Sequence, residues 1–218
     1  MTLTCSAMYN VTRLIHLADG LDDAEVAALI DVLHGAMATA AKRIVSPTLP
    51  GSRNGGTVLL HAQFPDQQSW ESAAESRLDN RLTTASVTHV DGVDYDASPV
   101  PATGPAGTVY RTLLLAVDPA TSPSIVEDFE ADLLLMPRYV ETITACRLSR
   151  PLRTLGASRW THVFEQQFTD EAGLMGAYLM HPIHWGRVDR WFDPECPEYI
   201  VSERVCHSFC RMDHPVLT

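Results

Sequence analysis

A segment rich in proline and glycine divides the chain into two halves of similar length. It reads Ala97-Ser-Pro-Val-Pro-Ala-Thr-Gly-Pro-Ala-Gly107. Three prolines and two glycines in eleven residues cannot continue a helix or a central strand. We therefore predict a first unit over residues 8–96, a linker over 97–107 and a second unit over 108–214.

The two halves show the same order of hydrophobic patterns. Each begins with an apolar strand, continues with an amphipathic helix, a second strand and a second helix, and ends with a strand. The second strands align with an offset of 104 residues, and both run into the sequence Gln-Phe-x-Asp. In chain order, the predicted elements cover residues 11–17, 24–37, 57–64, 67–78 and 86–93 in the first half, and 108–117, 125–135, 161–168, 170–180 and 199–209 in the second.

This order of elements predicts an α+β fold built from two ferredoxin-like repeats. A ferredoxin-like sheet carries its helices on one face and needs cover on the other. Two sheets packed face to face, or closed into a barrel, meet that need. We expect an intramolecular dimeric α/β-barrel, a pseudo-dimer within one chain. Two independent α+β domains are the alternative.

Charge and composition narrow the classes of partner. Asp and Glu outnumber Lys and Arg by 27 to 16, which gives a formal net charge of −11. That balance argues against binding to nucleic acid or to an anionic membrane surface. No stretch has the roughly 20 apolar residues of a membrane span, and the amino terminus lacks a signal-peptide pattern. The five cysteines are odd in number and irregularly spaced, which is typical of reduced thiols and favours a cytoplasmic location.

The densest group of reactive side chains is Tyr178-Leu-Met-His-Pro-Ile-His-Trp185. Tyr178 and His181 are three residues apart near the end of a predicted helix and can face the same way. Pro182 ends that helix, and His184 follows it. An imidazole is a competent general base near neutral pH, and a nearby phenol can donate a hydrogen bond to a developing oxyanion.

The strand over 160–168, the helix after it and the pattern Tyr178-x-x-His181-Pro182-x-His184 resemble the stress-responsive A/B-barrel (Dabb) family of dimeric α/β-barrel proteins. The similarity is clearest over residues 110–210 and fainter in the first half. The resemblance extends to plant polyketide cyclases of the olivetolic acid cyclase type, which close a linear polyketide by a cofactor-free aldol reaction.

The resemblance implies roles for individual residues. Tyr178 and His184 match the catalytic tyrosine and histidine, and His162 matches a histidine early in the central strand. Arg111 replaces another histidine of the family, which favours an anionic ligand. The first half keeps neither histidine of the motif nor its proline, so we expect one working pocket and one structural or lid-forming half. The side chains expected to contact substrate are His181, Arg111, Trp185 and Phe164.

Each of these residues also has a structural interpretation. His181 and His184 can cap a helix end, His162 can be satisfied within a core, and Trp185 can pack there. A metal site from His162, Glu165, His181 and His184, or a haem site with one histidine, is a further alternative. The cysteines Cys206 and Cys210 would stand about 13 Å apart on a strand, too far to share one zinc ion, so we interpret them as structural thiols.

The sequence therefore predicts a cofactor-independent acid–base enzyme that acts on a small, oxygenated, partly apolar metabolite. Proton abstraction next to a carbonyl, as in polyketide aldol cyclisation, is the reaction that the resemblance favours. A non-catalytic ligand-binding stress protein is the first alternative, and a haem- or metal-binding barrel is the second. The sequence leaves open the identity of the substrate and whether two fused barrels form a homodimer.

Overall fold

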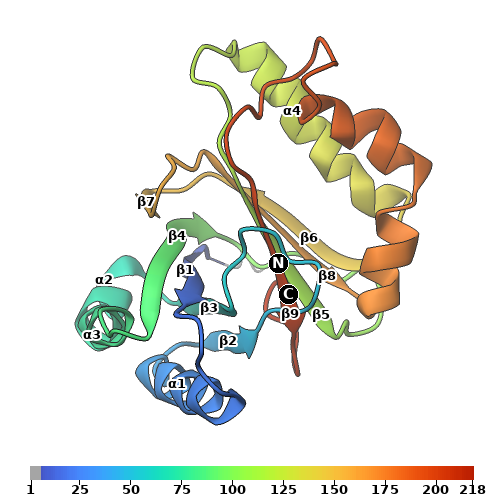
Figure 1. The fold of residues 1–218 in the computed structure, drawn as a ribbon. Helices are drawn as coiled ribbons and strands as arrows, with labels where there is room; N and C mark the ends of the chain where they lie inside the picture. The colour runs from blue at the N-terminus through green and yellow to red at the C-terminus, as the bar shows by residue number, and fades with distance from the viewer. Residues whose placement is uncertain (1–5) are drawn as a thin grey trace.

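The computed structural model describes residues 6–218, which form two antiparallel sheets with helices on their outer faces (Figure 1). The first half contains β1 (Met8–Leu17), α1 (Asp23–Ala36), β2 (Lys42–Pro47), β3 (Val58–Phe64), α2 (Gln67–Trp70), the π-helical turn η1 (Glu71–Glu75), α3 (Ser76–Leu82) and β4 (Val87–Ala97). The second half contains β5 (Val109–Leu115), α4 (Pro123–Leu135), η2 (Met136–Arg138), β6 (Ile143–Ser149), β7 (Arg153–Leu155), β8 (His162–Phe168), η3 (Gly173–Tyr178), η4 (His184–Val188), η5 (Asp189–Trp191) and β9 (Cys206–Arg211).

The first sheet has the order β2-β3-β1-β4-β7, and the second has the order β6-β8-β5-β9. Strand β7 comes from the second half of the chain but pairs with β4 of the first half, through Gly92–Leu155, Val93–Thr154 and Asp94–Arg153. Helices α1, α2 and α3 cover the outer face of the first sheet, and α4 with η3 and η4 covers that of the second (Figure 1). The second half therefore contributes an edge strand to the first sheet.

Matching caps begin the second helical segment of each half. Asp66 accepts a hydrogen bond from the backbone N–H of Ser69 at 2.7 Å, and Asp170 accepts one from Gly173 at 2.7 Å. These aspartates are the last residues of the repeated Gln-Phe-x-Asp sequence. A side-chain oxygen satisfies an N–H group at a helix start that has no partner within the helix. The repeat seen in the sequence is thus a repeat of local structure.

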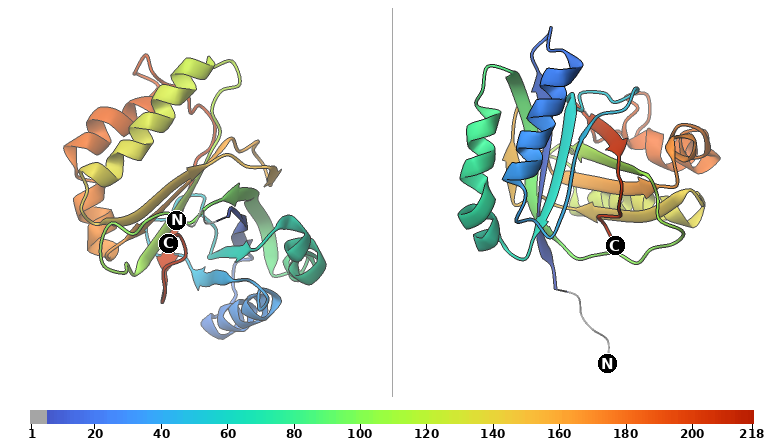
Figure 2. Two further views of the ribbon diagram at one scale, coloured as in Figure 1. Left: turned by 180° about the vertical axis from the view of Figure 1, so that it is seen from behind. Right: turned by 90° about the horizontal axis from the view of Figure 1, so that it is seen from below.

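The inner faces of the two sheets face each other and enclose a common core (Figure 2). Apolar residues from both halves form this core, including Leu14, Tyr95, Tyr110 and Val163. Backbone bridges join the loop after β2 to β9, at Thr48–Cys210 and Arg53–His207. The expected intramolecular α/β-barrel of two ferredoxin-like repeats is confirmed.

A buried polar network crosses the barrel interior. Oε2 of Glu165 accepts from Arg147 at 2.8 Å, and its Oε1 accepts from the hydroxyl of Tyr110 at 2.7 Å. Arg147 also donates to Asn10 of the first half at 3.0 Å. Burial opposes ionisation of Glu165, but Arg147, His61 and the hydrogen bond from Tyr110 together outweigh it, and the carboxyl pKa lies below its usual range. The interior of the barrel is thus filled and hydrogen-bonded.

The sequence-based expectation for the last strand was wrong at its start. The strand expected from Tyr199 begins only at Cys206. The backbone groups of the preceding residues pair elsewhere: Ile200 and Val201 donate to the carbonyl of Trp191, and Ile200 accepts from Asp118. An apolar, β-branched stretch therefore runs as a loop.

The segment over 52–56, expected between a helix and a strand, instead connects β2 to β3. Strand β2 begins with two cations and ends at a proline, which hides its alternating pattern. Strands β6 and β7 likewise lie outside the residue ranges that the sequence pattern predicts. None of the helices in residues 6–218 has the length and hydropathy needed to cross a bilayer.

Candidate functional site

A cavity of about 440 Å³ lies between the outer face of the second sheet and the helices that cover it. Its polar wall in the second half consists of Arg111, Tyr178, His184, Asp189 and His207. Its apolar wall includes Leu113, Leu133, Phe164, Val188 and Phe192. Arg53 and Asn54 of the first half complete the lining. A cavity of this size and mixed lining suits a small organic ligand.

Strand pairing brings the polar side chains of the sheet together. Strand β5 lies between β8 and β9, with Arg111 opposite Gln166 on one side and Phe209 on the other. His207 of β9 is opposite Leu113, which lies two positions after Arg111 on β5. Because alternate residues of a strand share a face, Arg111, Leu113 and His207 all point to the helix side. Arg111 is only 3% exposed.

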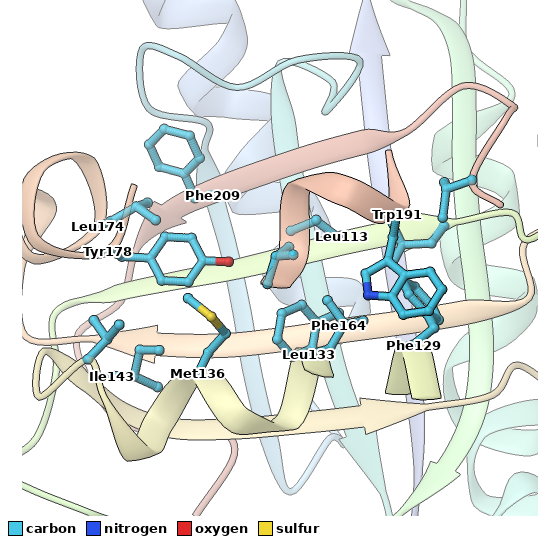
Figure 3. Close-up of a cluster of buried hydrophobic side chains, with 14 of the residues drawn as sticks. Leu113, Phe129, Leu133, Met136, Ile143, Phe164, Leu174, Tyr178, Trp191 and Phe209 are labelled. Atoms are coloured by element: carbon cyan, nitrogen blue, oxygen red, sulfur yellow. The ribbon is translucent and has the colours of Figure 1, made fainter. Parts of the chain in front are cut away.

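The hydroxyl of Tyr178 meets the guanidinium of Arg111 at the cavity. Nη1 of Arg111 donates to this hydroxyl at 3.1 Å, and the guanidinium lies 4.9 Å from the centre of the phenol ring. Figure 3 shows the ring within the buried cluster, with its oxygen directed toward the middle of the cluster. Burial raises the pKa of Tyr178, although Arg111 acts in the opposite direction. The phenol therefore keeps its proton while its oxygen accepts from Arg111.

His184 lies beside Tyr178 and beside a carboxylate. The two rings meet edge to face with centroids 4.9 Å apart, and Nδ1 of His184 is 3.1 Å from Oδ1 of Asp189. Burial lowers the pKa of His184, and Asp189 partly opposes this. The lowered pKa keeps the imidazole neutral near pH 7, which is the protonation state that a general base needs.

His207 completes the polar wall as a neutral acceptor. Nε of Arg111 donates to Nε2 of His207 at 2.7 Å. Burial lowers the pKa of His207 to about 2, and the charges of Arg111 and Arg53 add to the effect. His207 therefore orients the guanidinium without carrying a charge of its own.

The structure brings together four of the seven expected site residues, namely Tyr178, His184, Arg111 and Phe164. His162 lies on the same face of β8 as Phe164, but it does not line the cavity. Its Nε2 is 3.0 Å from Oε1 of Glu130, and its ring packs edge to face on Phe129. Burial lowers its pKa, and Glu130 opposes that shift.

His181 and Trp185 also lie outside the cavity lining. Nδ1 of His181 accepts from the backbone N–H of Ile183 at 3.2 Å, so this side chain stabilises the turn between η3 and η4. Trp185 is 54% exposed, and its indole N–H donates to the carbonyl of Leu179 at 2.9 Å. The spacing of the motif gave no indication that these two side chains turn away from the pocket.

Sequence reasoning missed four polar residues of the cavity: His207, Asp189, Arg53 and Asn54. The signal for His207 was its place in an alternating strand, one residue after Cys206. Asp189 lies five residues beyond His184, on the turn that follows η4. Arg53 had no local signal, because it reaches the site only through the docking of its loop on β9.

The corresponding space in the first half is filled. Val11 pairs with Ala62 as Arg111 pairs with Gln166, and residues 62 and 166 are related by the repeat offset of 104. Val11 is fully buried, and Trp70 packs its ring 5.3 Å from that of Phe64 in the same cluster. The first half therefore has an apolar core where the second half has its polar wall.

Within residues 6–218, no group of three or more His, Cys, Asp or Glu side chains is arranged to hold a metal ion. Cys206 and Cys210 are buried in the barrel interior, and burial raises the pKa of both thiols, that of Cys206 to about 12. Cys5 lies outside the described residues.

Residues 109–206 match the family model described as the Stress responsive A/B Barrel Domain. No curated protein matches the chain.

Solved structures match nearly the whole chain. An anthrone oxidase-like protein is 10% identical with a TM-score of 0.62, and the match covers 98% of this chain and 94% of that one. A putative monooxygenase from Fusobacterium nucleatum is 7% identical with a TM-score of 0.61, covering 96% and 93%. Another from Lactobacillus acidophilus is 10% identical with a TM-score of 0.55, covering 98% and 100%. At such identities the likeness concerns the fold.

Proposed function

We propose that this protein removes a proton from the carbon next to a carbonyl in a small organic substrate. The proposal proceeds from the match of residues 109–206 to the stress-responsive A/B-barrel domain. The substrate is oxygenated and partly apolar, to fit a cavity with an apolar wall and one polar side. Polyketide aldol cyclisation is the reaction of this class that we favour. A base and hydrogen-bond donors suffice for such a step, so the proposal includes no cofactor.

One observation carries the proposal: a phenol and a neutral imidazole lie next to each other on one cavity wall. The Tyr178 and His184 rings are 4.9 Å apart between centroids. Both side chains line the cavity, and Asp189 lies behind the imidazole. A general base next to an oxyanion donor is the minimal arrangement for making an enolate.

His184 is the base in this proposal. Its lowered pKa keeps it neutral at pH 7, with Nε2 able to accept the proton from the substrate carbon. The imidazolium that forms is stabilised by the carboxylate of Asp189, 3.1 Å from Nδ1. In an aldol cyclisation the enolate carbon then bonds to a second carbonyl carbon, and the new alkoxide takes the proton back from His184.

Tyr178 stabilises the enolate oxygen. Its oxygen already accepts from Arg111, so its own hydrogen remains for donation to the substrate. The positive charge of Arg111 strengthens that donation as negative charge develops on the substrate. Donors of this kind contribute most in a site from which water is excluded.

The experiment is proton–deuterium exchange at carbon, followed by NMR in D₂O. Acetophenone and phenylacetone are suitable probes, because both have acidic hydrogens next to a carbonyl. The protein is expected to accelerate exchange, and His184→Gln is expected to abolish the acceleration without unfolding the protein. Ligand-dependent stabilisation with no exchange for any ketone would replace the proposal with the non-catalytic binding alternative. Oxygen consumption is followed in parallel, since two of the solved structures with the same fold are of putative monooxygenases.

A further inference from the structure

We propose that the substrate is an organic anion, and that its carboxylate binds between Arg111 on the barrel wall and Arg53 on a loop from the first half. This inference rests on the proposed function in that it concerns the same cavity. It assigns the first half a direct part in substrate selection.

Arg111 is a buried cation without a negatively charged partner in residues 6–218. Its hydrogen bonds go to His207, Gln166 and Tyr178, all of which are neutral groups. Its third nitrogen, Nη2, donates to no side chain or carbonyl within these residues. Burying an unpaired charge is costly, and a bound anion would offset that cost.

The neighbours of Arg111 hold its charge in place without neutralising it. His207 accepts from Nε at 2.7 Å and Tyr178 accepts from Nη1 at 3.1 Å, which fixes the plane of the guanidinium. Burial lowers the pKa of His207 to about 2, so it stays neutral at physiological pH. A fixed guanidinium with a free terminal nitrogen suits a carboxylate.

Arg53 is held over the same cavity by the docking of its loop. Its backbone N–H donates to the carbonyl of His207 at 2.8 Å, and the N–H of His207 donates back at 2.8 Å. Residues paired in this way have their side chains on the same face, so Arg53 and His207 share the cavity side. The effect of the Arg53 charge on the pKa of His207 agrees with that proximity.

The loop lies too close to β9 to be a loosely attached flap. A Cβ atom on Gly55 would stand 2.8 Å from the carbonyl oxygen of His207, so only glycine fits there. Asn54 adopts a left-handed φ of 52° and donates from its side chain to the carbonyl of Val205 at 3.0 Å. Ser208 donates to the carbonyl of Gly55 at 2.8 Å. These contacts fix the position of Arg53 relative to Arg111.

The rest of the lining indicates an anion with one charged end. The cavity contains one carboxylate, Asp189, and it lies next to His184. The two guanidinium groups therefore exceed the acidic charge of the lining. The apolar wall, which includes Phe164 and Phe192, suits an aromatic or alkyl body. A keto acid meets both requirements, with its carboxylate at the arginines and its carbonyl at Tyr178.

The test compares matched ligands by isothermal titration calorimetry. The probes are para-acetylbenzoate and para-acetylbenzamide, which differ in charge and share a ketone and a ring. We expect the benzoate to bind about tenfold or more tightly, which corresponds to roughly 1.4 kcal/mol. Arg53→Gln should remove most of this preference with no change in melting temperature. Arg77→Gln, an exposed arginine on α3, is the matched control and should change nothing.

The outcomes separate this inference from the proposed function. Equal binding of the two probes, or an unchanged preference in Arg53→Gln, would overturn the inference even if deuterium exchange is observed. A preference for the benzoate that depends on Arg53 supports it even if exchange is absent. Arg111→Lys keeps a positive charge in the core but removes the planar guanidinium, which can donate two parallel hydrogen bonds to a carboxylate. We expect this variant to bind the benzoate more weakly while it remains folded.

Discussion

His61 and Glu165 stand at equivalent positions of the two repeats, and their side chains meet in the barrel interior. Nδ1 of His61 lies 3.7 Å from Oε1 of Glu165, and each is the central residue of a seven-residue strand. In a symmetric dimer of identical units, such positions would hold two copies of one residue. The fused chain places a base opposite an acid.

The ion pair of Glu165 with Arg147 should dominate the stability of the interior. Glu165→Gln leaves a buried arginine without its counter-charge, and we expect a loss of about 3–5 kcal/mol in the free energy of unfolding. Glu171→Gln is the control, because Glu171 pairs with Arg211 at the surface and the change should cost at most about 1 kcal/mol. Urea unfolding measures both, and equal losses would contradict the interpretation.

The protein should lose stability as the pH falls below about 6.5. Burial lowers the pKa of His61 to about 4, although Glu165 acts in the opposite direction. Between these values the unfolded chain takes up a proton on this residue and the folded protein does not, so acidification favours unfolding. One histidine contributes at most about 1.4 kcal/mol per pH unit over this range. His61→Gln should reduce the slope of unfolding free energy against pH, and an unchanged slope would refute this.

Tyr178→Phe and Tyr110→Phe should give opposite results. Both tyrosines are fully buried and hydrogen-bonded. Tyr178→Phe removes the proposed oxyanion donor, and we expect turnover to fall about 10²- to 10³-fold with a small loss of stability. Tyr110→Phe removes a hydrogen bond to Glu165 and should cost about 1.5–3 kcal/mol while turnover is unchanged. Steady-state kinetics and urea unfolding test the pair, and parallel losses in both variants would contradict separate roles.

The decrease of kcat/KM at low pH, the acid limb of the profile, should follow the protonation of His184. Because its pKa is lowered, mainly by burial, activity should persist below pH 6.5. Asp189 raises this pKa, so Asp189→Asn should move the limb to still lower pH and reduce the maximal rate. Asp193→Asn, an exposed aspartate on the same segment, should leave the profile in place. A limb that does not move in Asp189→Asn would argue for another base.

His162→Gln should affect stability and spare catalysis. His162 bonds to Glu130 and packs on Phe129 outside the cavity lining. We expect a loss of about 1.5–3 kcal/mol, typical of a hydrogen bond to a charged group, and unchanged kcat and KM. A large fall in kcat at unchanged stability would restore the catalytic role that the family resemblance implied for this residue.

The sequence predicted the fold well because the repeat is local. Each half signals its strands and helices through short-range periodicity, and the Gln-Phe-x-Asp caps mark the same helix start twice. The exceptions have long-range causes. Strand β7 is three residues long and depends on pairing with the other half. The stretch before Cys206 pairs with loops near Trp191 and Asp118.

The candidate site was predictable only as far as one short motif. Tyr178 and His184 are six residues apart, and Arg111 stood at a position that the family resemblance marked. His207 and Arg53 are separated by more than 150 residues, and only their backbone pairing brings them together. Which side chain of the motif faces the cavity depends on π-helical turns, whose wider spacing has no clear sequence signature.

Strand β7, which pairs with β4 of the other half, and the bridges from the β2–β3 loop to β9 change the role of the proline-rich segment in the molecule. The halves share one core, one sheet edge and one cavity, and none of these contacts depends on the peptide bonds between β4 and β5. A protease that cuts there would leave two fragments that remain together as one particle. The segment therefore ensures that the two halves are synthesised in equal number and associate quickly. Once the barrel has folded, its halves stay together without this covalent connection.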